Sequence, residues 1–112
     1  MQHIRYITVP KDKNASIALD FDTAKADELI EWQLTETEFM ELWNLKLFDQ
    51  INSSCQTMID DYESERITET ELLKQCFTLT TQAQKQANGS VKRFSEMIKY
   101  AIDFETGLYF YF

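Results

Sequence analysis

Few residues in this sequence have the types and spacing that catalysis or metal binding requires. His3 is the only histidine, and it lies far in sequence from both cysteines, Cys55 and Cys76. A structural zinc site needs about four Cys or His ligands, commonly in closely spaced pairs, so these residues predict no metal site. Both cysteines fall on apolar faces of expected helices, and we expect them to be reduced, buried thiols.

Two carboxylates, Asp20 and Asp22, form the motif closest to a known catalytic pattern. Asp-Phe-Asp-Thr at 20–23 follows a strand-like apolar run and is similar to the nucleophile segment of haloacid-dehalogenase-type phosphatases. The similarity fails because Ala24 stands where that segment has Thr or Val, and because the chain is too short for that fold. The stretch also lacks the third ligand and the glycine of a calcium loop. We expect these carboxylates to lie on the surface at a strand edge.

Other catalytic patterns are also missing from the sequence. The two glycines stand alone, so there is no glycine-rich loop to bind phosphate. No serine or cysteine lies in the context of a nucleophile elbow, and His3 is the only ordinary general base for neutral pH. The sequence therefore predicts a protein that is not an enzyme, with no catalytic residue and no cofactor.

Charge is the feature that points most clearly to a function. Residues 1–71 hold 16 acids and 6 bases, a net of −10, whereas residues 72–112 hold 3 acids and 5 bases, a net of +2. Most of the acids are concentrated in residues 27–41 and 60–71. Nucleic acids and anionic membranes require a basic binding face, so neither is an expected ligand. The distribution favours a basic protein as the partner.

The lengths of the apolar segments indicate where in the cell the protein is expected. No apolar run approaches the about 18 residues that a membrane span needs. Residues 1–8 are neither long enough nor basic enough for a signal peptide. We therefore expect a soluble, cytoplasmic protein.

One long segment is expected to position both groups of acids. Apolar residues recur at three- and four-residue spacing over residues 35–62, which predicts one long amphipathic helix. Thr35 and Glu38 have the spacing of a capping box at its start. Residues 53–54 are two serines, weak helix formers at which we expect the helix to bend or break.

The remaining elements are predicted from shorter patterns. Residues 4–9 are rich in β-branched and aromatic residues and are followed by Pro10, which predicts a first strand, and alternating apolar residues predict strands at 17–21 and 30–34. The first two strands are expected to pair as a hairpin, and the composition of 24–33 also suits a helix. Residues 63–66 read as a solvated link.

The last third of the chain is expected to add two helices and a strand. One helix begins near Glu69 and ends at residues 88–89, and the next carries the apolar stripe of 91–102. Five large apolar residues at 108–112 predict a buried strand. The expected fold class is α+β, a single domain over 1–112 with about three helices packed on a small, mostly antiparallel sheet that contains the C-terminal strand.

Four segments carry a resemblance to a known class of proteins. They are Leu-Thr-Glu-Thr-Glu-Phe at 34–39, Leu-Phe-Asp-Gln-Ile-Asn at 47–52, Ile-Asp-Asp-Tyr-Glu at 59–63 and Thr-Gly-Leu-Tyr-Phe-Tyr-Phe at 106–112. With them the chain resembles the immunity proteins of bacterial toxin–immunity systems, most closely the contact-dependent growth inhibition type. The resemblance implies a cytoplasmic α+β protein that binds the toxic domain of a sibling toxin, often a nuclease, and blocks its active or substrate-binding site.

The acidic charge fits this expectation physically. A nuclease needs a basic cleft for phosphates, and carboxylates on an inhibitor both steer association and fill that cleft. An acidic adaptor or anti-regulatory protein that holds a basic partner is the alternative. Trp and Tyr dominate binding hot spots, so two aromatics beside the acids are included, whereas Trp43 is expected in the core. The expected partner-binding residues are Trp32, Glu36, Glu38, Glu41, Asp60, Asp61, Tyr62, Glu63 and Glu65.

Overall fold

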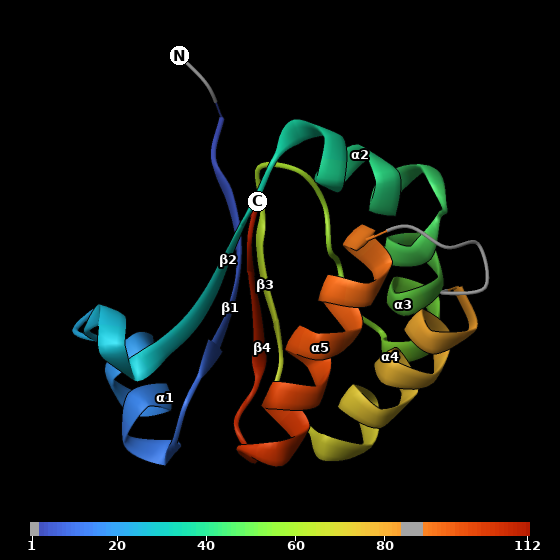
Figure 1. Ribbon diagram of the computed structural model, residues 1–112. Helices are drawn as coiled ribbons and strands as arrows, with labels where there is room; N and C mark the ends of the chain where they lie inside the picture. Colours follow the sequence, from blue (N-terminus) through green and yellow to red (C-terminus); the bar gives the residue numbers. More distant parts are fainter. Residues whose placement is uncertain (1–2, 84–88) are drawn as a thin grey trace.

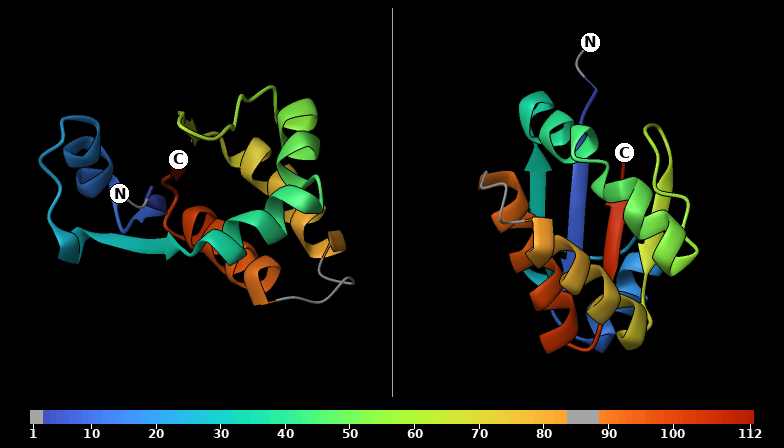
Figure 2. Two further views of the ribbon diagram at one scale, coloured as in Figure 1. Left: turned by 90° about the horizontal axis from the view of Figure 1, so that it is seen from above. Right: turned by 90° about the vertical axis from the view of Figure 1, so that its right-hand side faces the viewer.

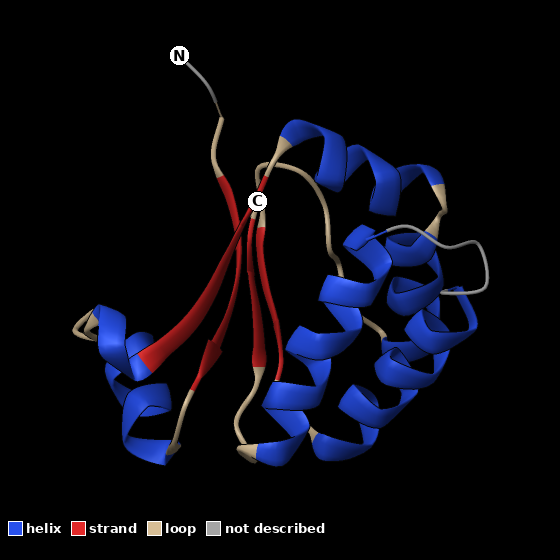
Figure 3. Cartoon of the chain, in the orientation of Figure 1, coloured by secondary structure: helices blue, strands red, loops and turns tan. Residues whose placement is uncertain are grey.

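The computed structural model describes residues 3–83 and 89–112, and it contains a four-stranded sheet with helices on both faces (Figures 1 and 3). The strands follow the order β2-β1-β4-β3, and every neighbouring pair is antiparallel. This confirms the α+β class, with five α-helices in the described part of the chain instead of about three. The elements are β1 (Arg5–Pro10), α1 (Lys13–Asp20), a short 3₁₀ helix η1 (Ala26–Glu28), β2 (Leu29–Leu34), α2 (Glu36–Asn44), α3 (Leu47–Cys55), β3 (Ser64–Ile67), α4 (Thr70–Ala83), α5 (Gly89–Asp103) and β4 (Leu108–Tyr111).

The two inner strands, β1 and β4, separate a thick helical layer from a thin one. In the described part of the chain, helices α2 to α5 lie on one side of the sheet, and α1 lies on the other side together with the short η1 (Figures 1 and 2). Along β4, Leu108 and Phe110 are fully buried on the side of the thick layer, and Phe110 pairs in register with Ile7 of β1. The expectation of a buried C-terminal strand is confirmed.

An aromatic cluster fills the space between the sheet and the thick helical layer. Phe48 of α3 lies at its centre and is 1% exposed. Most of the ring pairs around it have tilted or edge-to-face geometry, which aromatic quadrupoles favour. Rings within 6.4 Å of the Phe48 ring centroid belong to Phe39, Trp43, Phe94, Phe110 and Phe112.

The prediction of a single helix over residues 35–62 is wrong. Helix α2 ends at Asn44, Lys46 takes a left-handed conformation with φ 58°, and α3 then runs in a new direction (Figure 1). A straight helix of that length would extend roughly 40 Å, more than the longest dimension of the molecule, 37 Å. The break lies at Lys46, and the serines at 53–54 remain helical in α3.

The start of this segment follows the expected capping pattern. The Glu38 backbone N–H donates to Thr35 Oγ1 at 3.1 Å, and the Thr35 N–H donates to Glu38 Oε1 at 2.8 Å. These two bonds satisfy N–H groups that the first helical turn leaves free. The predicted capping box is confirmed.

The prediction of a strand at 17–21 is also wrong, because residues 17–20 belong to helix α1 and Phe21 is its C-cap. Asp12 caps the helix by accepting from the Ala15 N–H at 2.8 Å. Ile17 and Phe21 are 50% and 75% exposed, so the alternation of apolar residues there does not mark a buried face. With no strand beside it at 17–21, β1 pairs with β2 instead.

The remaining sequence predictions are largely confirmed. The strand at 30–34 forms as β2, and the helical alternative over 24–33 is limited to η1. Helix α4 begins at Thr70, close to its expected start at Glu69. Its end is expected at 88–89, but residue 88 lies outside the described residues, and Gly89 is the first residue of α5 and not the end of α4. Cys55 and Cys76 are buried free thiols. The link expected at 63–66 is wrong, since Ser64–Ile67 forms edge strand β3.

Candidate protein-binding site

Arg5 brings the two acidic segments together at one end of the sheet. It is 5% exposed at the start of β1, and its Nε and Nη2 donate to the two oxygens of Asp61 at 2.9 and 2.8 Å. Its Nη1 donates to Glu36 Oε2 at 2.7 Å. The guanidinium carbon also lies 4.0 Å from the Phe39 ring centroid. The start of α2 and the connection between α3 and β3 therefore meet here, at the end of the sheet where the C-terminus lies (Figure 1).

The connection between α3 and β3, residues 56–63, is called the acidic loop below. The Asn52 side chain braces it from α3, donating from Nδ2 to the Ile59 carbonyl at 3.0 Å and accepting from the Ile59 N–H at 2.8 Å. Glu65 braces it from β3 by accepting from the Met58 N–H at 2.8 Å. The loop is thus held by hydrogen bonds from both flanking elements.

Two non-glycine residues of the acidic loop have left-handed backbone conformations. Gln56, with φ 56°, ends α3, and Tyr62, with φ 63°, lies in the turn that leads into β3. Such conformations cost of order 1 kcal/mol or more and persist where the surroundings enforce them, often at functional sites. The His3 ring stacks on the Tyr62 ring, with 4.2 Å between their centroids.

The acidic loop also presents the two most exposed large side chains on this end of the molecule. Met58 is 79% exposed and Tyr62 is 74% exposed. Adaptable methionine and rigid tyrosine are residue types that protein interfaces favour. Both side chains are held on a loop whose backbone is already braced by hydrogen bonds.

The carboxylates expected to bind a partner differ in their exposure and in the hydrogen bonds and ion pairs that they already make within the chain. Asp60 and Glu63 are exposed, and the Glu36 side chain remains 63% exposed while it pairs with Arg5. Asp61 and Glu65 are half-buried and support the loop.

Two further predicted contact residues have intramolecular roles on α2. Glu38 completes the capping box, and Glu41 accepts from Ser90 Oγ at 2.6 Å. The carboxylates that remain most available to a partner are therefore Glu36, Asp60 and Glu63.

The aromatic residues are placed differently from the expectation. Trp32 is 6% exposed and packs in the core, so it does not fit a role at the interface. Trp43, expected in the core, is 37% exposed at the surface of α2 and stacks on Phe39. Of the aromatic residues selected from the sequence, Tyr62 is the one that lies exposed beside the acids.

The sequence reasoning missed Arg5, Met58 and His3 as parts of this site. Arg5 lies two residues before Ile7 and four before Val9, so in a strand its side chain shares their inward face. This pattern indicates a buried charge, which is stable only when acidic side chains pair with it. His3 Nε2 hydrogen-bonds the Phe112 backbone oxygen and lies 3.3 Å from Asp61. No local sequence signal indicates the exposure of Met58.

The Arg5–Asp61 pair gives the fold a defined pH dependence. Hydrogen bonds from Arg5 lower the pKa of Asp61 against the opposing effect of burial. Because the folded-state pKa lies below the unfolded value of about 4, the stabilisation is fully present above that pH and is lost as the pH falls through the folded-state pKa. We expect the free energy of unfolding to decrease more steeply between about pH 5 and pH 2 for the wild type than for Asp61→Asn. Urea unfolding across this range measures both slopes, and equal slopes would contradict the assignment.

Comparison with known proteins adds no family to this description. No family model matches the chain, and no curated protein and no solved structure gives a match. Within residues 3–83 and 89–112, no group of three His, Cys, Asp or Glu is placed to hold a metal ion. In the same part of the chain, no helix combines the length and apolar character needed to cross a membrane.

Proposed function

We propose that this protein is an immunity protein that binds and neutralises a cognate toxin domain in the bacterial cytoplasm. We expect this toxin domain to be a nuclease. The observation that carries the proposal is the junction of the two acidic segments at Arg5. This junction sets exposed carboxylates around two exposed side chains, Met58 and Tyr62. The toxin would be blocked because the acidic loop and the start of α2 cover its active or substrate-binding cleft.

The charge and rigidity of the site support a basic cleft as the target. A nuclease cleft binds phosphates with Lys and Arg, and carboxylates on a braced loop offer it a competing set of anions. A loop that is already ordered loses little conformational entropy on binding. Tyr62 and Met58 would displace water at the centre, where charge pairs alone contribute little net affinity.

The acids that a partner would meet are fewer than the sequence suggests. Strand β3 carries the chain away from the acidic loop, so Glu69 and Glu71 lie at the opposite end of the sheet, at the start of α4 (Figure 1). These two residues therefore serve as matched controls for Asp60 and Glu63, since all four are exposed carboxylates.

The test begins with purification of the protein from its native cell and identification of any basic protein that accompanies it. Association with that partner is then measured at rising salt for Asp60→Lys with Glu63→Lys and for Glu69→Lys with Glu71→Lys. The proposal expects the first pair to slow association about tenfold at low salt and the second pair to leave it nearly unchanged. Absence of a basic partner, or equal effects of both pairs, would refute it.

Tyr62→Ala is expected to weaken binding of the same partner by about 2 kcal/mol, or roughly 30-fold, because an exposed tyrosine at the centre of an interface acts as a hot spot. The fold should be unaffected, since the Tyr62 side chain is largely exposed. Titration calorimetry measures the affinity, with Ile17→Ala, an exposed apolar residue on α1, as the control. A melting temperature that collapses in Tyr62→Ala, or an unchanged affinity, would contradict this role.

An adaptor that holds a basic regulatory or secretion partner is the second candidate, because it would use the same acidic surface. Deletion of the gene separates the two functions. An immunity protein is needed only when the neighbouring toxin is produced, whereas loss of an adaptor causes a regulatory defect without any toxin.

A further inference from the structure

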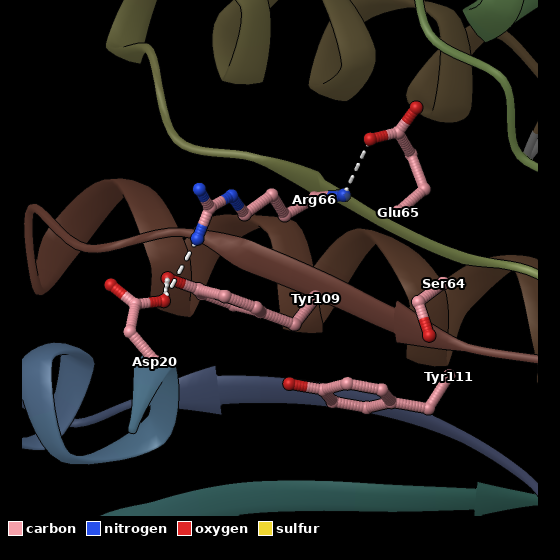
Figure 4. A pocket seen from close by; sticks show the side chains of 6 residues that line it. All are labelled: Asp20, Ser64, Glu65, Arg66, Tyr109 and Tyr111. Atoms are coloured by element: carbon pink, nitrogen blue, oxygen red, sulfur yellow. Dashed lines mark hydrogen bonds and ion pairs between the residues drawn. The ribbon is translucent and has the colours of Figure 1, made fainter. Parts of the chain in front are cut away.

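The two edge strands of the sheet, β3 and β2, differ in how far their outward backbone groups are already bonded. In β3, the Phe112 N–H donates to the Glu63 carbonyl, so residues 63, 65 and 67 bond β4 and Arg66 directs its N–H outward. That N–H donates to Glu65 Oε1 at 2.8 Å (Figure 4), and the other carboxylate oxygen of Glu65 accepts from the Met58 N–H. The edge of β3 is therefore occupied by a side chain of the protein itself.

Strand β2 leaves its outward groups open. The Lys11 N–H donates to the Glu28 carbonyl at 2.9 Å, one position beyond the register of β1 with β2, so residues 30, 32 and 34 bond β1. Glu31 and Gln33 alternate with them and direct both N–H and carbonyl groups away from β1. Among the described residues, no hydrogen bond reaches the backbone groups of Glu31 or Gln33.

An open edge of this kind can pair with another extended chain. β2 spans Leu29–Leu34 and contains neither proline nor lysine, residues that commonly protect such edges. Leu29 adds an outward carbonyl, while its N–H donates to Ala26. The buried side chains of Trp32 and Leu34 fix the strand in register. The edge is therefore preformed for main-chain hydrogen bonds, the mode in which a partner adds a strand to a sheet.

A second copy of the chain does not fit this edge well. Two copies of β2 can pair all three outward residues, Leu29, Glu31 and Gln33, only in the antiparallel register that sets Glu31 opposite its own counterpart. Like charges directly opposite each other destabilise such a pair. Any shifted register loses at least one of the three residue pairs. The formal net charge of −8 adds repulsion between copies.

Glu31 determines the charge of the segment that fits. It is exposed, and within the described part of the chain it takes part in no ion pair. Its neighbours on the same face of the sheet, Gln33 along β2 and Thr8 opposite in β1, are uncharged. Lys11 and Lys25 lie at the far end of the strand, where η1 supplies two carboxylates of its own. A cation opposite Glu31 on an added strand would complete a cross-strand ion pair.

We propose that the edge of β2 binds an extended segment of a basic protein partner as an added strand, with a lysine or arginine opposite Glu31. The added strand would be continuous with the candidate site, because β2 ends at Leu34, directly opposite Arg5, and leads into Glu36. Identifying this segment as part of the toxin rests on the proposed function. The pairing of a basic strand with β2 does not.

The test is amide hydrogen exchange of the full chain, followed by NMR, with the peptide acetyl-Lys-Val-Lys-Val-Lys-Val-amide. Its lysines would share the face of Glu31, and their backbone nitrogens would donate to β2. At saturation, exchange at the Glu31 and Gln33 amides is expected to slow about tenfold. The same peptide methylated on its lysine nitrogens keeps the charge but cannot donate, so it should give no slowing. Methylation on the valine nitrogens should preserve the slowing.

Two sets of substitutions separate the backbone from the charge. Gln33→Pro removes an outward N–H while leaving the bonds between β2 and β1, so it should weaken peptide binding about tenfold, whereas Gln33→Ala keeps the N–H and should not. Glu31→Gln should weaken binding about threefold, and Glu71→Gln, on α4, should leave it unchanged. The same spectra report whether each variant is folded, and the methylated peptides carry the test if Gln33→Pro is not.

The outcomes separate this proposal from the proposed function. Equal slowing with the peptide methylated on lysine, or shifts confined to residues 60–63, would show a general attraction to the acidic loop and overturn the added strand. Slow exchange without peptide that increases with protein concentration would assign the edge to a second copy and also overturn it. Equal binding of acetyl-Glu-Val-Glu-Val-Glu-Val-amide would overturn the requirement for a basic segment. Failure of the toxin-binding test would leave peptide-dependent protection at Glu31 intact.

Discussion

Arg5→Met is expected to lower the free energy of unfolding by about 3 kcal/mol, because it leaves the half-buried Asp61 carboxylate without its cation. Methionine keeps the packing over the Phe39 ring, so the loss reports the charge and its hydrogen bonds. The effect belongs at the lower end for broken buried pairs, since the Asp61 side chain keeps 26% exposure. Partner affinity should fall as well, because Arg5 holds the acidic loop against α2.

Urea unfolding at pH 7 measures the loss. Lys99→Met is the matched control, because its pair with Asp103 spans one helical turn and both side chains are more than half exposed. The control should change stability by less than about 0.5 kcal/mol. Similar losses for the two variants would show that Arg5 is an ordinary surface charge and would remove the basis for joining the acidic segments.

Phe48→Ala is expected to cost about 4 kcal/mol, the largest effect of any single change predicted here, because the side chain is 1% exposed and contacts five other aromatic rings. The cavity would lie between α2, α3, α5 and β4, where edge-to-face packing leaves the remaining rings little room to collapse. A loss of this size is a large share of the stability of a small domain.

Thermal and urea unfolding followed by circular dichroism test this prediction, with Phe21→Ala as the control. Phe21 is the same residue type at 75% exposure, so its removal should change stability by no more than about 0.5 kcal/mol. A loss below about 2 kcal/mol for Phe48→Ala would mean that the aromatic cluster repacks, and that α3 is not fixed by it.

The sequence by itself determines the elements whose signals are local. β-Branched and aromatic residues predict β1, alternation predicts β2, the run of apolar residues predicts β4, and the capping box at Thr35 predicts the start of α2. Each of these patterns acts within a few residues, so its physics is contained in the segment that carries it. The clustering of acids is likewise a property of the sequence.

Local patterns mislead where the tertiary structure competes with them. The apolar stripe of residues 35–62 is continuous, yet the compact core needs Phe48 to turn inward against the sheet, and the chain breaks at Lys46 to allow it. The alternation at 17–21 predicts a strand, yet Asp12 caps a helix whose Ile17 stays half exposed.

Only the tertiary structure decides the candidate binding site. Arg5 meets Glu36 across 31 positions and Asp61 across 56, and no local propensity encodes contacts at such separations. The same long-range packing buries Trp32 while it leaves Tyr62 exposed beside the acids. The sequence therefore determines that the chain is acidic and which residues are acidic. Packing of β1 against α2 and the acidic loop determines which of those acids are brought together, because a buried guanidinium is stable only where carboxylates from distant segments surround it.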